Sequence, residues 1–149
     1  MRSAIHNYNK NSDYFITMLT QKKQCYFGKV SGGKMLLNKY GKIAHDQMIW
    51  LNDYYDFVKI GAFVVMPNHV HAIIRLRVAQ GKDAPRSLSQ LAGAYKTRTS
   101  TRIRKAGLHG FSWHRSFHDH IIRSAASYDA ITEYILDNPV RWQADRYFR

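Results

Sequence analysis

The 149-residue sequence is poor in cysteine and in acidic residues, with one Cys, Cys25, and 10 Asp and Glu. One cysteine excludes an internal disulfide and a zinc site built from several cysteines, and it suits a reducing compartment. No apolar run approaches the roughly 20 residues that span a bilayer. The polar start, Met1–Lys10, lacks the apolar stretch of a secretion signal. We therefore expect a soluble, cytoplasmic protein with no membrane partner.

Basic residues are abundant: Lys and Arg total 23, which gives a formal net charge of +13 and a pI near 10.0. A charge of this size favours a polyanionic partner, with nucleic acid as the leading candidate. Hydrophobic residues make up 45% of the chain, enough for one compact core, and no linker interrupts the sequence. We predict one catalytic domain over residues 1–149, frayed at 1–12 and 143–149.

Hydrophobic periodicity and turn residues predict alternating strands and helices. The predicted strands are Tyr14–Thr20, Tyr26–Val30, Lys34–Leu37, Val58–Met66, His69–Val78 and Asp119–Arg123. The predicted helices run from Asn38 to about Phe57, from Ser87 to Ala106, and from Ser124 or Ser127 to about Asp137.

The pair His69 and His71 lies in a predicted strand, where a period of two points both imidazoles to one side of the sheet. Two neutral imidazoles side by side can chelate a divalent metal ion. Ordinary surface or hydrogen-bonded histidines remain the alternative, because a His-x-His pattern alone is common.

Tyr134 and Asn138 lie one turn apart in the last predicted helix and share a face of it. The neighbouring stripe of Tyr128, Ile131 and Ile135 is apolar, so the helix can pack on that side and present Tyr134 on its flank. Alternatively, Tyr134 is a core aromatic residue, and Asn138 before Pro139 only ends the helix.

Three segments together resemble the single-tyrosine HUH transposases, in particular the REP-associated tyrosine transposases and their insertion-sequence relatives. These segments are Val64–His71 (VVMPNHVH), Trp113–Arg123 (WHRSFHDHIIR) and Tyr134–Pro139 (YILDNP). The resemblance implies an α/β (α+β), ferredoxin-like single domain with a central antiparallel sheet flanked by helices.

The resemblance also implies a metal-dependent endonuclease and strand transferase that acts on single-stranded DNA with hairpin structure. Tyr134 would be the nucleophile and form a 5′-phosphotyrosine intermediate. His69 and His71 would bind Mg²⁺ or Mn²⁺, with Asn138 as a third ligand where many insertion-sequence relatives carry glutamine. The family includes both homodimers and monomers, so the resemblance leaves the oligomeric state open.

Other residues are weaker candidates. His120 is an additional active-site candidate. The alternative is that it belongs to a hydrogen-bonded structural cluster with Asp119. Arg98, Arg102 and Lys105 share a helix face without acidic partners and are predicted to contact DNA phosphates, unless that face is merely solvated. Two other functions stay open, a domesticated protein that binds hairpin DNA without transposition, and a zinc hydrolase. The second is disfavoured because the chain has one glutamate, Glu133.

Overall fold

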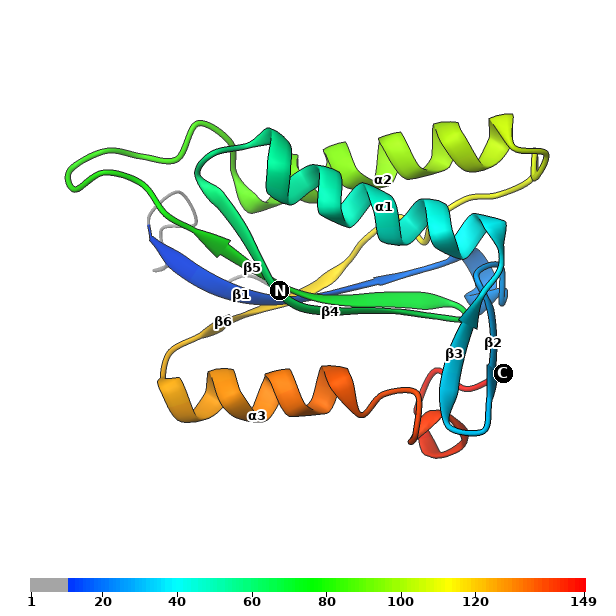
Figure 1. Cartoon of the computed structure of the whole chain (residues 1–149). Helices are drawn as coiled ribbons and strands as arrows, with labels where there is room; N and C mark the ends of the chain where they lie inside the picture. The colour runs from blue at the N-terminus through cyan, green and yellow to red at the C-terminus, as the bar shows by residue number, and fades with distance from the viewer. Residues whose placement is uncertain (1–10) are drawn as a thin grey trace.

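The computed structural model describes residues 11–149, and its centre is a four-stranded antiparallel sheet (Figure 1). The strand order is β4-β5-β1-β6. These strands are β1 (Ser12–Leu19), β4 (Val58–Met66), β5 (His69–Leu76) and β6 (His118–Ile122). A separate two-stranded sheet pairs β2 (Gly28–Ser31) with β3 (Lys34–Leu37). The predicted fold class is confirmed.

Helices cover both faces of the sheet (Figure 1). The helices α1 (Lys39–Tyr54) and α2 (Leu88–Lys105) lie side by side on one face, and α3 (Ala125–Leu136) crosses the other. Without the β2–β3 hairpin and α3, the order of elements is βαββαβ, which is the ferredoxin-like arrangement. None of the helices in residues 11–149 is long and apolar enough to cross a membrane.

Side-chain caps explain where the three helices begin. Asn38 accepts hydrogen bonds from the backbone N–H groups of Tyr40 and Gly41, and Ser87 and Gln90 form a reciprocal capping box. Ser124 accepts from the N–H of Ser127, so it is Ser124 that caps α3. The predicted helix starts at Asn38 and Ser87 are thus confirmed, and the choice left open for α3 is settled.

The two faces of β5 have different roles, as its alternating sequence predicts. Val70, Ala72, Ile74 and Leu76 belong to the main core with residues of α1 and α2. Ile73 points to the opposite side, where it packs with Ile122 and Ile135 beneath α3. His69 and His71 have the same parity as Ile73, so the strand places them on the α3 side.

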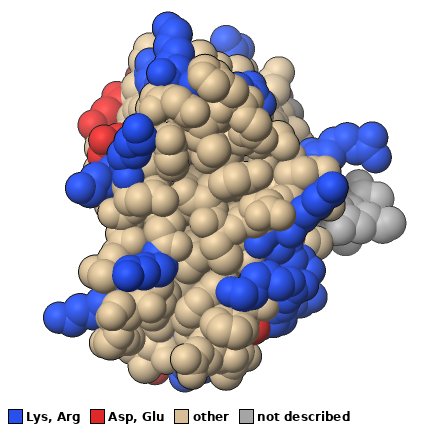
Figure 2. Space-filling view, turned by 90° about the vertical axis from the view of Figure 1, so that its right-hand side faces the viewer, with Lys and Arg blue, Asp and Glu red and all other residues tan. Residues whose placement is uncertain are grey.

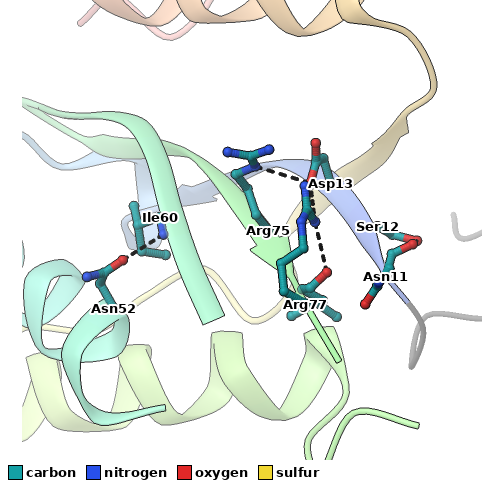
Figure 3. Close-up of polar contacts among 8 residues, drawn as sticks. Asn11, Ser12, Asp13, Asn52, Ile60, Arg75 and Arg77 are labelled. Carbon is teal, nitrogen blue, oxygen red and sulfur yellow. Dashed lines mark hydrogen bonds and ion pairs between the residues drawn. The ribbon is translucent and has the colours of Figure 1, made fainter. Parts of the chain in front are cut away.

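Ion pairs join β1 and β5 at the end of the sheet where β1 begins. Nearby, a bulge in β4 lets α3 approach closely. Asp13 of β1 pairs with Arg75 at 3.4 Å and with Arg77 at 2.8 Å (Figure 3). The β4–β5 register shifts between Ile60 and Phe63, and a Cβ on Gly61 would lie 2.7 Å from the Tyr128 hydroxyl of α3. The absent side chain of Gly61 therefore makes room for α3.

The end of the chain, residues 143–149, which the sequence predicts to be frayed, packs onto the fold in the structure. A short 3₁₀ helix, Trp142–Ala144, is followed by Tyr147, and the side chains of Trp142 and Tyr147 are both buried. Their aromatic area, packed against the α3 side of the sheet, outweighs the entropy gained by fraying. At the other end, Ser12 of β1 pairs with Leu76 of β5, so the strand begins within the predicted frayed start 1–12, of which residues 1–10 lie outside the described residues.

Candidate active site

His69 and His71 lie side by side at the start of β5 and are almost completely buried, with 0% and 2% of their surface exposed. Their ring centroids are 4.5 Å apart. Burial lowers the pKa of His69 to about 4, and a nearby carboxylate, Asp145, opposes that shift only in part. Burial also lowers the pKa of His71 well below its usual value. Both imidazoles are therefore neutral near pH 7, which is the state that binds metal ions.

Hydrogen bonds determine which nitrogen of His69 carries the proton. The side-chain N–H₂ of Asn68 donates to the carbonyls of Lys23, at 3.2 Å, and Tyr147, at 2.7 Å, so its Oδ1 must accept. That oxygen lies 2.8 Å from Nδ1 of His69. Nδ1 is therefore protonated, and Nε2 carries a lone pair on the other side of the ring.

The lone pair of His69 faces another acceptor. Asn138 donates its side-chain N–H₂ to the carbonyl of Tyr134 at 3.0 Å, which turns its Oδ1 toward His69. This oxygen is 3.4 Å from Nε2 of His69. Two acceptors that converge without a proton between them are the arrangement that a cation satisfies.

His71 leaves a second nitrogen without a partner. Its Nδ1 lies 2.8 Å from the hydroxyl of Thr17, and its Nε2 is buried and forms no hydrogen bond. A buried nitrogen of this kind costs free energy unless something coordinates it. The same region holds Asp145: one nitrogen from each histidine and one carboxylate oxygen all lie within 4.8 Å of one another. These donors fit a divalent metal ion.

A cavity of about 280 Å³ opens beside His71. The Tyr134 ring centroid lies 5.5 Å from that of His71, and the side chain of Tyr134 is 36% exposed. The ring of Phe15 packs between these groups and His120, at 5.2 Å from His71, 5.3 Å from His120 and 6.1 Å from Tyr134. Phe15 thus lines the cavity and contacts the rings of His71, His120 and Tyr134.

Several predicted residues meet in this place, and others do not. His69 and His71 of β5 meet Tyr134 of α3 and Asn138 of the turn that follows α3. His120 lines the cavity from β6 but lies outside the group that could hold a metal ion. Arg98, Arg102 and Lys105 belong to α2, on the opposite face of the sheet (Figure 1).

Arg98 is engaged within the helical layer. Its guanidinium carbon lies 3.9 Å from the centre of the Trp50 ring, and its Nε donates to the side chain of Gln47 at 3.0 Å. The periodicity of α2 places Arg98 beside Arg102 and Lys105, but it cannot show that α1 supplies partners for one of them. Arg98 therefore joins α1 to α2.

Sequence reasoning missed the contribution of the chain end. Asp145 approaches the histidines, and Arg146 and Tyr147 line the cavity. The one signal for it in the sequence is the density of aromatic residues, Trp142, Tyr147 and Phe148, because exposed ends are seldom so apolar.

Basic side chains outnumber acidic ones at the end of the molecule at which the site lies. Figure 2 views this end and shows many Lys and Arg residues and few acidic ones. The end includes the last turn of α2, with Arg102, Arg104 and Lys105, and the β2–β3 hairpin, with Lys29 and Lys34 (Figure 1). A positive surface of this kind attracts polyanions.

Comparisons with known proteins agree with this arrangement. Residues 34–138 match the family described as "Transposase IS200 like". An uncharacterized protein of Haemophilus influenzae is 31% identical over 166 residues, which cover 99% of this chain and 91% of the relative.

Two solved structures share the fold. A REP-associated tyrosine transposase bound to a REP hairpin has a TM-score of 0.66 and 24% identity, with 95% of this chain and 74% of that chain covered. A protein of Deinococcus radiodurans described as a candidate transposase has a TM-score of 0.52 and 17% identity, with 92% and 97% covered.

Proposed function

The chain belongs to the family of IS200-like transposases, and from the geometry of its site we propose that it cleaves and rejoins single-stranded DNA through Tyr134. The observation that carries the proposal is the position of Tyr134. Its ring lies 5.5 Å from His71, a buried histidine whose Nε2 has no hydrogen-bond partner, at the edge of one cavity. A nucleophile and a group that can hold a phosphate-binding cation are thus neighbours within one chain.

Tyr134 is the tyrosine of this cavity best suited to attack. Tyr147, the other tyrosine of the cavity, is 8% exposed, and burial raises the pKa of its phenol. Tyr134 is 36% exposed, so a phosphodiester can reach its hydroxyl.

The proposed reaction is an in-line displacement. The phenolic oxygen of Tyr134 forms a bond to phosphorus as its proton leaves, and the bond from phosphorus to the 3′-oxygen breaks, which yields a 5′-phosphotyrosine and a free 3′-OH. Attack by a second 3′-OH on the same phosphorus releases Tyr134 and joins the new ends. The covalent intermediate conserves the phosphodiester energy, which explains the use of tyrosine in place of water.

His69, His71 and Asn138 would hold Mg²⁺ or Mn²⁺. Such an ion, when bound, withdraws charge from a non-bridging oxygen of the phosphate and favours ionisation of the nearby phenol. Asn68 and Thr17 hold the two imidazoles in place through their Nδ1 atoms, so that both Nε2 atoms remain available. His120, exposed at the mouth of the cavity, is positioned to contact the phosphate.

Hairpin DNA is the proposed partner. The solved REP-associated transposase is bound to a REP hairpin, and the present chain presents a basic surface at the end where its cavity lies (Figure 2). Phosphate contacts from Lys and Arg give affinity without regard to sequence, and a hairpin places duplex and single strand next to each other.

A covalent adduct tests the proposal. A single-stranded oligonucleotide that carries a hairpin is incubated with the protein and Mg²⁺ and then run on a denaturing gel. We expect a protein–DNA species that Tyr134→Phe abolishes and that Tyr147→Phe, the matched variant in the same cavity, retains. An adduct formed equally by Tyr134→Phe contradicts the assignment. Free 5′-phosphate ends without an adduct favour a metal hydrolase, and binding without cleavage favours a domesticated DNA-binding protein.

A further inference from the structure

The segment after α3 folds back onto the histidine pair. The Trp142 ring centroid lies 6.1 Å from that of His69, and the Tyr147 ring centroid lies 4.9 Å from it. The carbonyl of Tyr147 accepts the 2.7 Å hydrogen bond from Asn68, the residue that also orients His69. Asp145 lies between these two anchors, so its position beside the histidines is fixed from both sides.

One oxygen of Asp145 has a partner within the segment. Oδ1 accepts a hydrogen bond from the backbone N–H of Tyr147 at 2.7 Å. A carboxylate has two oxygens and about four acceptor sites, so most of its capacity remains. Among residues 11–149, Asp145 forms no salt bridge, although its carboxylate lies within 4.8 Å of nitrogens of His69 and His71. The carboxylate therefore lies beside the two histidines with acceptor sites that a cation could use.

A hydrogen bond to His69 does not explain the carboxylate. Asn68 takes the one proton of the neutral His69 ring on Nδ1, so Nε2 has no hydrogen to donate to Asp145. The lone pair of His69 thus has two oxygen-bearing neighbours from other parts of the fold, Asn138 from the turn after α3 and Asp145 from the chain end.

We propose that Asp145 is a metal ligand, which acts with His69 and His71 and supplies a negative charge next to the two imidazoles. This inference rests on the metal ion of the proposed function and adds a residue from outside β5 and α3. Carboxylate oxygen is the ligand that Mg²⁺ and Mn²⁺ prefer, and two imidazoles with one carboxylate leave coordination positions open for a phosphate oxygen. Residues 142–147 are then part of the active site, since they position this ligand.

The test measures Mn²⁺ binding by titration calorimetry without DNA, so that it does not depend on catalysis. Asp145→Asn keeps an oxygen for the N–H of Tyr147 and removes only the charge. We expect at least a tenfold loss of Mn²⁺ affinity. Asp137→Asn is the matched control, because the one ion pair of Asp137 among residues 11–149 is with Arg141 at the surface, and it should bind as the wild type does. Wild-type affinity in Asp145→Asn overturns the proposal.

Two further comparisons separate the possible failures. If Asp145→Asn melts below the wild type in chelator, Asp145→Glu and Asp145→Gln decide, since they match in length and differ in charge. Glu must bind Mn²⁺ more tightly than Gln, and equal affinities overturn the assignment. The double variant His69→Asn, His71→Asn reports on the metal site itself. If it binds Mn²⁺ as the wild type does, the metal site of the proposed function fails, and the role of Asp145 fails with it.

Discussion

Oδ1 of Asn68 accepts a hydrogen bond from Nδ1 of His69 across 2.8 Å, and this contact fixes the tautomer of a buried imidazole. The amide of Asn68 has no freedom to rotate, because its N–H₂ group donates to the carbonyls of Lys23 and Tyr147. One side chain thus joins three parts of the chain: the 3₁₀ turn Gln21–Lys23, the start of β5 and the chain end.

Asn68→Ala should weaken metal binding although Asn68 is not itself a ligand. Without its oxygen, the His69 ring can place its proton on either nitrogen and can rotate away from the site. Residues that orient metal ligands change affinity by about 10–100-fold when they are removed. Calorimetric titration with Mn²⁺ measures the loss. Asn52→Ala, which removes an amide that accepts from Ile60 at the far end of the sheet, is the control and should bind normally (Figure 3).

Acid should destabilise the protein through its buried histidines. The pKa of His69 is about 6.5 when unfolded and about 4 when folded, so between these values the unfolded chain binds a proton that the folded chain excludes. Stability from this residue is complete above pH 6.5 and is lost as the pH falls toward 4. His69 alone should lower the free energy of unfolding by about 2 kcal/mol from pH 7 to pH 5. His71 acts in the same direction.

Urea unfolding in chelator at the two pH values measures this difference. The double variant His69→Asn, His71→Asn should show a smaller decrease than the wild type. His109→Asn, which removes an exposed histidine, should keep the full decrease. An unchanged pH dependence in the double variant would show that other groups cause the acid effect.

Local patterns in the sequence predicted the strands and helices, whereas the ferredoxin-like arrangement was inferred from the family resemblance. Alternation separated Val70, which the structure places in the main core, from Ile73, which it places beneath α3, and the capping residues Asn38 and Ser87 marked the helix starts. These signals depend on neighbours in sequence, where strand and helix periods apply directly. The convergence of Tyr134 and His71 was inferred through the family resemblance.

Contacts between distant elements could not be predicted in this way. Asp145 reaches the histidines because Trp142 and Tyr147 pack against them, and no period relates the chain end to β5. Similarly, Arg98 was predicted to contact a phosphate because its face of α2 has no acidic residues. In the structure, the side chain of Arg98 contacts Trp50 and Gln47 of α1. Charge patterns within one helix do not reveal the partners that a neighbouring helix supplies.

Arg98→Ala should lower the free energy of unfolding more than Lys105→Ala does. The variant loses the contact with the Trp50 ring and the hydrogen bond to Gln47, together about 1–2 kcal/mol. Lys105→Ala, at an exposed position of the same helix, should change stability by less than about 0.5 kcal/mol. Urea unfolding compares the two variants. Equal stability in both would mean that Arg98 is free to serve as a DNA contact.

The active site should be complete within one chain, because Tyr134 lies beside its own His71. Mixing His71→Asn with Tyr134→Phe therefore should not restore the covalent adduct. In a dimer whose sites combine His71 of one chain with Tyr134 of the other, the mixture would regain about a quarter of the wild-type sites. Adduct formation at that level would show an exchange of α3 between chains.

Arg146 should bind a DNA phosphate at the mouth of the cavity. Its side chain is exposed, lines the cavity together with His118 and His120, and extends from the segment that is anchored by the hydrogen bond between Asn68 and Tyr147. A guanidinium there can form paired hydrogen bonds to a phosphate. Arg146→Ala should weaken hairpin binding by about tenfold and reduce the slope of log affinity against log salt by about 1.

Fluorescence anisotropy across a salt series measures both quantities, in a Tyr134→Phe background that prevents cleavage. Arg86→Ala is the matched control, since it removes the same charge from an exposed position just before α2. The helix α2 begins at the end of the molecule that lies away from the cavity (Figure 1). Its general electrostatic effect should be small, because the two ends are separated by more than a Debye length of about 8 Å at physiological salt. If both variants lose the same affinity and the same slope, Arg146 contributes only to the overall positive field, and the cavity mouth has no dedicated phosphate contact.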